Sequence, residues 1–290
     1  MFSYLSIITQ FLHFVKTQIF FMKTTFSYQN NLETLSQICI QLRKYILEST
    51  AAAGSGHPTS SLSAVEIIGS LMFGGFFDPK IDRLIFSKGH ACPLLYSVYT
   101  VNGEISYEEL MTLRQFGSRL EGHPTMRLPF TEAATGSLGQ GLGVATGICI
   151  AQKLLGKGKT FVLLGDSEMA EGSNWEAFML ASYRNLENLV AIVDVNRLGQ
   201  RGETMFGDNA QNYADKLTAF GCETVVIDGQ NLAECFQALK TLANSNNKKP
   251  KAIVCKTQKG AGISFLANKE GWHGKALSKE QLALALVELN

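Results

Sequence analysis

Two oxygen-bearing side chains follow two apolar runs of the chain and are candidates to bind one metal ion together. Asp166 comes after the run Thr160–Leu164 and a glycine, and Asn196 follows the run Leu189–Val193. Such runs are typical of parallel strands covered on both faces, and ligands of parallel sheets bind beyond the carboxyl ends of the strands. We therefore expect the two side chains to converge. A carboxylate and an amide oxygen suit Mg²⁺ or Ca²⁺, and the backbone carbonyl of Leu198 is a candidate third ligand.

The residues alone leave an alternative open for this pair. In it, Asp166 caps the helix that follows and Asn196 only makes a turn, so that no metal is bound. Each of the two residues lies just past the end of an expected strand. These matching positions support the metal site as a hypothesis beside that alternative.

Four histidines lie in loops bounded by glycine or proline, and the chain has five in all: His57, His90, His123 and His273, with His13 apart from them. Loops at strand ends are where ligands collect. Histidine donates to phosphate and hydroxyl groups and carries protons near neutral pH. The four loop histidines are therefore candidate binding and catalytic residues.

Alternating helices and strands must position these residues. We expect strands at 82–87, 160–164, 189–193, 224–227 and 252–255, and helices at 31–49, 63–73, from about 93, 143–155, 173–184, 231–243 and 279–289. Residues 54–60 are expected to form a polar loop, residues 102–129 a loop with a short helix, and residues 244–249 a surface turn. This order predicts an α/β fold with a doubly wound, mostly parallel sheet and helices on both faces.

The composition fits one such domain, which we place at residues 31–290. Hydrophobic residues make up 46% of the 290 residues, which is enough for a large core. A net charge of +1 offers no basic field for nucleic acid or for an anionic membrane surface. The six cysteines form no CxxC pair, and we expect reduced, mostly buried thiols in a cytoplasmic protein.

Residues 1–30 differ from the rest of the chain. They are apolar, but Ser, Thr, Gln, His13 and Lys16 interrupt them, so they lack the run of about 20 apolar residues of a membrane helix. They also lack the features of a secretory signal or a mitochondrial leader. One interpretation is an extension upstream of a true start at Met22, either disordered or not translated. The other is an amphipathic segment that docks on a partner.

Several segments resemble a known family. Gly165-Asp166-Ser167 followed by Asp194-Val195-Asn196 resembles the thiamine diphosphate signature, which begins Gly-Asp-Gly and ends in Asn. Six further segments resemble transketolase motifs in the family's order and with similar spacing: Ser55–Ser60, Ser87–His90, Glu121–Pro124, Gly136–Gly141, Asn196–Gln200 and Gly271–Lys275. The resemblance covers about residues 32–290. It identifies the chain as a member of the transketolase-type, thiamine-diphosphate-dependent enzymes, with the fold that binds this cofactor.

The resemblance implies a set of cofactor contacts. Asp166, Asn196 and the Leu198 carbonyl would hold Mg²⁺ or Ca²⁺, which anchors the diphosphate. Ser167 stands where the family has glycine, and this departure puts the cofactor affinity in doubt. Other cofactor-binding residues implied in this way are Ser60, His90, Gly136, Ser137, Leu138, Lys259 and His273. The alternatives are a solvated loop charge for Lys259 and tight helix packing by small residues for the Gly136–Gly141 segment.

The resemblance also implies catalytic residues. His57 would contact the sugar near its reacting carbon, His273 would lie between diphosphate and substrate, and His123 near both substrate and thiazolium ring. Glu171 would lie at a dimer interface between two active sites. The alternative for Glu171 is a carboxylate that only caps a helix, where the macrodipole favours it.

The reaction that the resemblance implies is transfer of a two-carbon ketol unit from a ketose to an aldose, in carbohydrate metabolism such as the pentose phosphate pathway. The family also needs a pyrimidine-binding domain, which we do not find before Asn290. We therefore expect the N-terminal subunit of a split transketolase, which acts on sugar phosphates with a separate C-terminal subunit in an α2β2 assembly. The alternatives are a subunit of deoxyxylulose-phosphate synthase or of a 2-oxoacid dehydrogenase, or a non-catalytic regulatory homologue.

Overall fold

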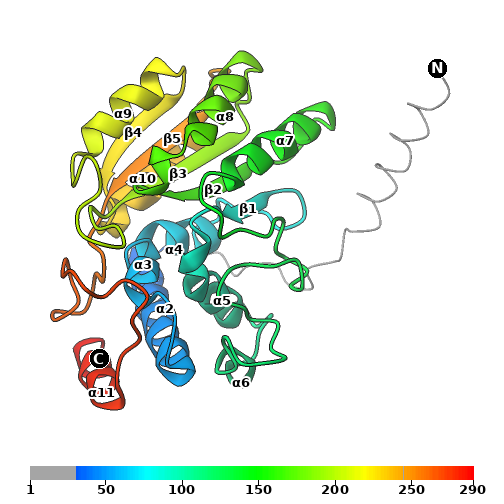
Figure 1. The fold of residues 1–290 in the computed structure, drawn as a ribbon. Helices are drawn as coiled ribbons and strands as arrows, with labels where there is room; N and C mark the ends of the chain where they lie inside the picture. Colours follow the sequence, from blue (N-terminus) through cyan, green and yellow to red (C-terminus); the bar gives the residue numbers. More distant parts are fainter. Residues whose placement is uncertain (1–30, 244) are drawn as a thin grey trace.

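Five parallel strands form the centre of the protein in the computed structural model, which describes residues 31–243 and 245–290 (Figure 1). The strands are β1 (Arg83–Phe86), β2 (Thr160–Gly165), β3 (Leu189–Val195), β4 (Glu223–Asp228) and β5 (Lys251–Lys256). Their order in the sheet is β1-β2-β3-β5-β4, and each neighbouring pair is parallel. The predicted parallel sheet is confirmed. The interpretations of residues 1–30, and of Asn244 in the expected turn, lie outside the described residues.

Helices cover both faces of the sheet, which explains why its central strands are apolar along most of their length. Helices α2, α4, α5 and α10 pack into one apolar cluster with Leu163 and Ile192, and α7, α8 and α9 into another with Val162 and Ala191. The longer helices are α2 (Leu32–Ala53), α4 (Val65–Phe73), α5 (Cys92–Val101), α7 (Gly141–Leu154), α8 (Gly172–Tyr183), α9 (Ala210–Ala219), α10 (Leu232–Ala243) and α11 (Lys279–Glu288). Alternate residues of a strand point to opposite faces, so β1, β2, β3 and β5 each contribute residues to both clusters.

Local sequence sets the ends of these helices. The Asn31 side chain accepts a hydrogen bond from the Glu33 backbone N–H at 2.8 Å and begins α2, which ends at Gly54 with φ +61°. Ser278 and Gln281 form a capping box that begins α11. Both patterns can be read from the sequence.

One expected loop is partly a helix. We predicted a polar loop at 54–60, but α3 (Pro58–Leu62) begins inside it. Pro58 has the fixed φ that suits a first helical position, and the Ser61 hydroxyl donates back to the His57 carbonyl at 3.0 Å. Ser60 and Ser61 therefore lie within a short helix and are buried. Three further short helices are η1 (Gly89–Ala91), α6 (Tyr107–Leu110) and η2 (Glu168–Ala170).

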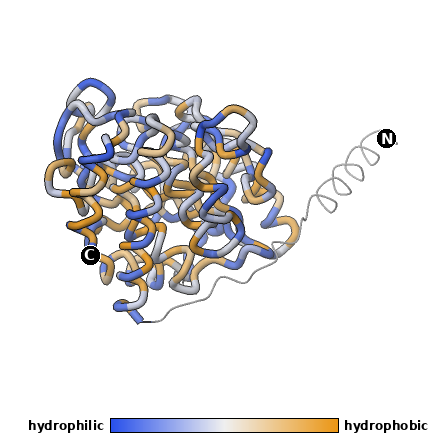
Figure 2. Tube along the Cα trace, turned by 90° about the horizontal axis from the view of Figure 1, so that it is seen from below, coloured by the Kyte–Doolittle hydropathy of each residue, from blue (hydrophilic) through white to orange (hydrophobic). Residues whose placement is uncertain are grey.

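Hydropathy alternates along most elements, as expected where one side of an element faces the core and the other faces solvent (Figure 2). All six cysteines are free and buried, as the sequence predicted. Within residues 31–243 and 245–290, no helix combines the length and the apolar character needed to cross a membrane.

Candidate active site

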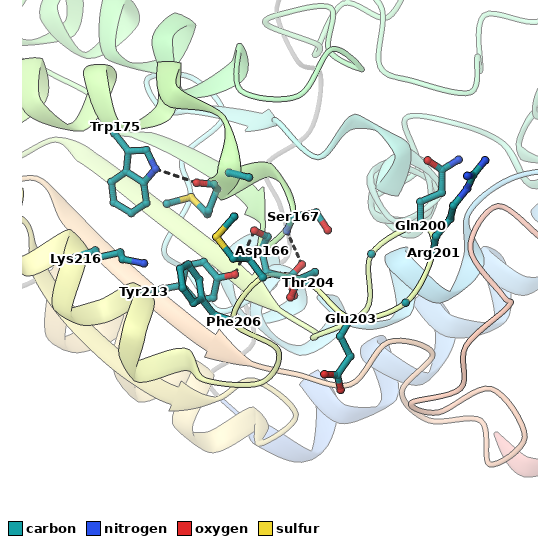
Figure 3. A pocket seen from close by; sticks show the side chains of 15 residues that line it. Asp166, Ser167, Trp175, Gln200, Arg201, Glu203, Thr204, Phe206, Tyr213 and Lys216 are labelled. Atoms are coloured by element: carbon teal, nitrogen blue, oxygen red, sulfur yellow. Dashed lines mark hydrogen bonds between the residues drawn. The ribbon is translucent and has the colours of Figure 1, made fainter.

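The ends of β2 and β3 bring the two predicted metal ligands to one edge of the sheet. Gly165 pairs with Asp194, and the Asp166 backbone N–H donates to the Asp194 carbonyl at 3.1 Å. Asp166 and Asn196 follow directly from this register, and each is only 4% exposed. The Asp166 carboxylate accepts hydrogen bonds from the Ser167 N–H at 2.8 Å and from the Thr204 hydroxyl at 3.3 Å (Figure 3).

Asp166 does not cap the helix after it. The N-cap of α8 is Glu171, and that of the preceding turn η2 is Ser167. The alternative interpretation of Asp166 as a helix cap is therefore wrong. Burial and the nearby charge of Asp194 raise the pKa of Asp166 to about 6, against the smaller opposing effect of the Ser167 N–H. A divalent cation at this carboxylate would supply the positive charge that favours its ionised form.

The donor set fits a metal that shares its ligands with a phosphate. Asp166 offers one carboxylate, Asn196 one amide oxygen and Leu198 one backbone carbonyl. No group of three or more His, Cys, Asp or Glu side chains that could hold a metal occurs in the described part of the chain. Mg²⁺ is commonly bound by one or two carboxylates, with waters and substrate phosphates completing its octahedron. The set therefore suits Mg²⁺ on a diphosphate better than an all-protein metal site.

Three of the loop histidines form a cluster beside this edge. The ring centroids of His57 and His90 are 5.2 Å apart, those of His57 and His273 are 4.9 Å apart, and those of His90 and His273 are 5.5 Å apart. The His57 Nδ1 atom is buried and finds no hydrogen-bond partner among the described residues. A buried polar atom without a partner is costly, and a bound ligand would relieve that cost. The structure therefore brings three of the four candidate loop histidines together.

The cluster is neutral at physiological pH. Burial, the neighbouring His273 and Arg114 lower the pKa of His57 to about 3. Burial, Lys259 and Lys88 lower the pKa of His273 to about 4, and burial followed by Lys88 lowers that of His90. Neutral imidazoles offer one donor and one acceptor each, so they can hydrogen-bond to hydroxyl and carbonyl groups.

Lys259 fixes the tautomer of His273. Its ammonium lies 2.9 Å from His273 Nδ1 and also donates to the carbonyls of Leu198 at 2.8 Å and Gly199 at 3.1 Å. An ammonium only donates, so Nδ1 accepts and the imidazole proton resides on Nε2. Lys259 is 3% exposed, and burial with the charge of Lys88 lowers its pKa to about 8. The alternative of a solvated loop charge is therefore wrong.

The glycine-rich segment 136–141 lies against His123 and the end of β1. A Cβ built on Gly136, whose φ is +138°, would lie 3.0 Å from the His123 ring. A Cβ on Gly141 would lie 2.4 Å from the Ser87 hydroxyl. Small residues therefore pack tightly at this segment, as the alternative interpretation expects. This packing does not bear on a cofactor role for Gly136, Ser137 and Leu138, which stays a prediction. Ser137 is exposed and Leu138 is half-buried.

Ser167 and Glu171 are both exposed near this edge. Ser167 has φ −61°, an ordinary helical value, so the position does not demand the glycine that the family usually has. Glu171 occupies the N-cap position of α8, but its side chain makes no capping hydrogen bond within the described chain. Asp166 and Ser167 also line a cavity of about 440 Å³ whose aromatic walls are Trp175, Phe206 and Tyr213 (Figure 3).

Four charged residues near the site did not enter the sequence-based set. Buried Glu168 accepts hydrogen bonds from the Ser87 hydroxyl and from the Gly139 N–H at 2.9 Å, which ties the glycine segment to the sheet. The other three are Lys88, Arg114 and Asp194. The sequence could have indicated a role for Asp194, because a carboxylate within an apolar strand must find buried hydrogen-bond partners. Burial raises its pKa, but Lys88 and several hydrogen bonds outweigh burial and hold it below the ordinary value.

Comparison with known proteins identifies relatives of nearly the whole described chain. The family model for the thiamine diphosphate binding domain of transketolase matches residues 35–289. Transketolase-like protein 2 of Bos taurus is 45% identical over 259 residues, which cover 86% of this chain and 41% of that protein. The chain therefore spans less than half the length of such curated relatives.

A second type of relative has a similar length. One subunit of the apulose-4-phosphate transketolase of Phocaeicola vulgatus is 35% identical over 267 residues, which cover 89% of this chain and 95% of its relative. Among solved structures, transketolase from Campylobacter jejuni superposes with a TM-score of 0.82 at 32% identity, over 89% of this chain and 43% of that one.

Proposed function

Since this chain belongs to the transketolase family through its thiamine diphosphate binding domain, we propose that it is the diphosphate-binding subunit of a two-chain transketolase. Its reaction would transfer a two-carbon ketol unit from a ketose to an aldose. The observation that carries the proposal is the convergence of Asp166 and Asn196 beside the cluster of three loop histidines.

The metal ligands we propose are Asp166, Asn196 and the Leu198 carbonyl, with Mg²⁺ or Ca²⁺ as the ion. The carbonyl also accepts from Lys259, and a carbonyl oxygen has a second lone pair for a metal. Ser60, His90, Ser167 and Lys259, with Gly136, Ser137 and Leu138, would contact the cofactor. The closeness of Gly89 to Gly136 supports this, since a Cβ on Gly89 would lie 2.9 Å from the Gly136 nitrogen.

The histidines that we propose for catalysis are neutral donors and acceptors. Bound thiamine diphosphate supplies the electron-accepting chemistry for cleavage beside a carbonyl. His273 would donate from Nε2 to a substrate or diphosphate oxygen, because Lys259 keeps its Nδ1 as the acceptor. His57 and His123 would hydrogen-bond to substrate oxygens and move protons. Glu171 would act at a contact between two active sites, which its exposure supports.

The relative of similar length supports a partner chain, since its name marks it as one subunit of a transketolase. We propose a separate subunit with the pyrimidine-binding site, an α2β2 assembly and a sugar-phosphate substrate. The six free, buried thiols support a reducing compartment such as the cytoplasm. Cofactor binding separates the proposal from a non-catalytic homologue, which would bind or regulate a partner without needing thiamine diphosphate.

The test is a donor assay on the reconstituted pair. This chain is produced with a chain from the same genome that resembles the pyrimidine-binding and C-terminal domains of transketolase. Ketose phosphates and 2-oxoacids are offered as donors, with thiamine diphosphate and Mg²⁺. Turnover of a ketose donor supports the proposal. Turnover of 2-oxoacids alone would assign another thiamine-diphosphate enzyme, and absence of cofactor binding would favour a regulatory homologue.

A further inference from the structure

We propose that Asp194 is a positioning residue that sets the side-chain amide of Asn196 so that its oxygen faces the metal site. The inference deepens the proposed function and rests on it for the identity of the metal site. The orientation of the Asn196 amide can be measured independently of any cofactor.

Asp194 is a carboxylate with no exposure, within the apolar strand β3. Its Oδ2 atom accepts hydrogen bonds from the Ser63 hydroxyl at 2.6 Å, from Asn196 Nδ2 at 2.9 Å and from the Lys88 ammonium. Its Oδ1 atom accepts from the Thr257 hydroxyl. A buried carboxylate with this many donors is fully used as an acceptor, so it has one stable orientation.

Asn196 takes its orientation from this carboxylate at its nitrogen, while its oxygen accepts a longer hydrogen bond from the Leu198 backbone N–H at 3.3 Å and keeps a second lone pair for a metal. An amide carries its oxygen and its nitrogen on opposite arms, and only the nitrogen arm can donate to Asp194. Rotation of the amide by 180° would bring its oxygen against Asp194 Oδ2, which would place two acceptors together. The observed contact therefore directs the Asn196 oxygen away from Asp194 and holds it there. Metal ligands depend on such outer partners for their orientation.

The carboxylate itself is held by segments from across the chain. Lys88 follows β1 and is 1% exposed, and its ammonium also donates to the Ser60 carbonyl at 2.9 Å. Ser63 follows α3, and Thr257 follows β5 and donates its backbone N–H to the Val195 carbonyl at 3.0 Å. Three segments distant from β3 in sequence thus donate to this one carboxylate. This rigidity distinguishes a positioning device from an incidental contact.

The decisive variant replaces the buried ion pair by apolar side chains, Lys88→Met with Asp194→Leu. Such replacements are often tolerated because neither charge is left unpaired. They remove the acceptor for Asn196. We expect the Mg²⁺ concentration for half-maximal thiamine diphosphate binding by the reconstituted pair to rise by about 10- to 100-fold, as for the loss of other outer partners of metal ligands.

Two comparison variants separate orientation from general disruption. In Asp194→Asn, the Lys88 ammonium attracts the amide oxygen to the former Oδ2 position, so the acceptor for Asn196 is kept and the Mg²⁺ requirement should stay close to that of the wild type. Ser63→Ala removes another donor to Asp194 without touching Asn196, and should also leave the requirement unchanged. Thermal unfolding without ligands records the stability of each variant.

A second measurement reads the amide directly. In the wild-type chain labelled with ¹⁵N-asparagine and assigned through Asn196→Ser, one Asn196 side-chain amide proton should exchange slowly with solvent. Fast exchange of both protons in the wild type would overturn the inference, and so would a wild-type Mg²⁺ requirement in the double variant. If the wild-type pair bound no cofactor, the proposed function would fail, and the amide measurement alone would decide the orientation.

Discussion

Asp166 is a carboxylate in surroundings that disfavour its charge. It is 4% exposed and lies near a second buried carboxylate, Asp194, whose own charge is balanced by Lys88. Burial and Asp194 raise its pKa to about 6. Titratable groups with such pKa shifts often mark functional sites, because a bound ligand supplies the stabilising charge that the protein itself does not provide. A divalent cation is the ligand that suits a carboxylate, an amide oxygen and a carbonyl.

Asp166→Ala should therefore weaken thiamine diphosphate binding in the presence of Mg²⁺ by about 100-fold or more, beyond the usual effect of losing an outer partner. Titration calorimetry on the reconstituted pair measures this. Asp208→Ala is the matched control, because Asp208 is an exposed carboxylate that pairs with Lys256 at the surface. If Asp166→Ala bound the cofactor as tightly as the wild type, the assignment of the metal site would be wrong.

Lys259→Met should raise the pKa of His273. That pKa is lowered to about 4, first by burial and then by the positive charges of Lys259 and Lys88. A nearby cation disfavours the imidazolium, so removing it moves the pKa upward, while burial keeps it below the ordinary value near 6.5. NMR titration of the histidine resonances checks the shift.

Lys275→Met is the control for this prediction. Lys275 also lies close to His273 in sequence, but its ammonium rests on the Trp272 ring at 4.9 Å from the centroid. The His273 pKa should not respond to its removal. An equal rise in both variants would show that general charge, and not the contact at Nδ1, sets the pKa.

At the scale of elements, most of the fold could be predicted from the hydrophobic periodicity and from the residues that end each strand. The runs at β2 and β3 are apolar because helices cover both faces of the sheet. These apolar runs predicted where the two strands end, and therefore that Asp166 and Asn196 lie close together. The helix α3 was not predicted, because serine often bonds locally to the backbone outside helices, whereas here the Ser61 hydroxyl donates to the His57 carbonyl within a helical turn. The contacts of Lys88 and Lys259 could not be predicted either, since each depends on how loops distant in sequence fold over one strand edge.

Two glycines of α7 should respond in opposite ways to alanine. A Cβ on Gly141 would lie 2.4 Å from the Ser87 hydroxyl and 2.8 Å from its Cα, so Gly141→Ala should destabilise the chain by about 1–3 kcal/mol. At Gly143, no described atom outside the neighbouring backbone of the helix itself lies within 4 Å of the new Cβ. Gly143→Ala should therefore stabilise the helix by about 0.5–1 kcal/mol.

Urea unfolding of the isolated chain measures both changes, and each variant serves as the control for the other. Equal destabilisation by the two substitutions would mean that α7 does not pack on the end of β1 as described. Because Gly141 begins the helix next to the glycine segment, its substitution should also weaken cofactor binding by the reconstituted pair, whereas Gly143 lies further along the helix from that segment.

At the scale of the whole molecule, the site opens at one edge of a sheet that is otherwise covered. The proposed metal ligands and the histidine cluster lie where β2, β3 and β5 end, and loops from the first and last thirds of the chain meet there. Relatives such as transketolase-like protein 2 have more than twice the aligned length. The relative of similar length is named as one subunit of a transketolase. In the proposed function, this chain supplies the contacts with the diphosphate and a partner supplies those with the rest of the cofactor.

A cofactor shared between two chains has a thermodynamic consequence. A ligand stabilises the state that binds it by RT ln(1 + [L]/Kd), or about 2.7 kcal/mol at 100 times Kd. Thiamine diphosphate with Mg²⁺ should therefore raise the unfolding temperature of the mixed chains well above its effect on either chain alone. Asp166→Ala in the mixture should abolish the rise, because the partner's contacts then lack the metal-bound diphosphate. A full rise for this chain without a partner would show that it completes the cofactor site by itself, and the two-chain assignment would have to be abandoned.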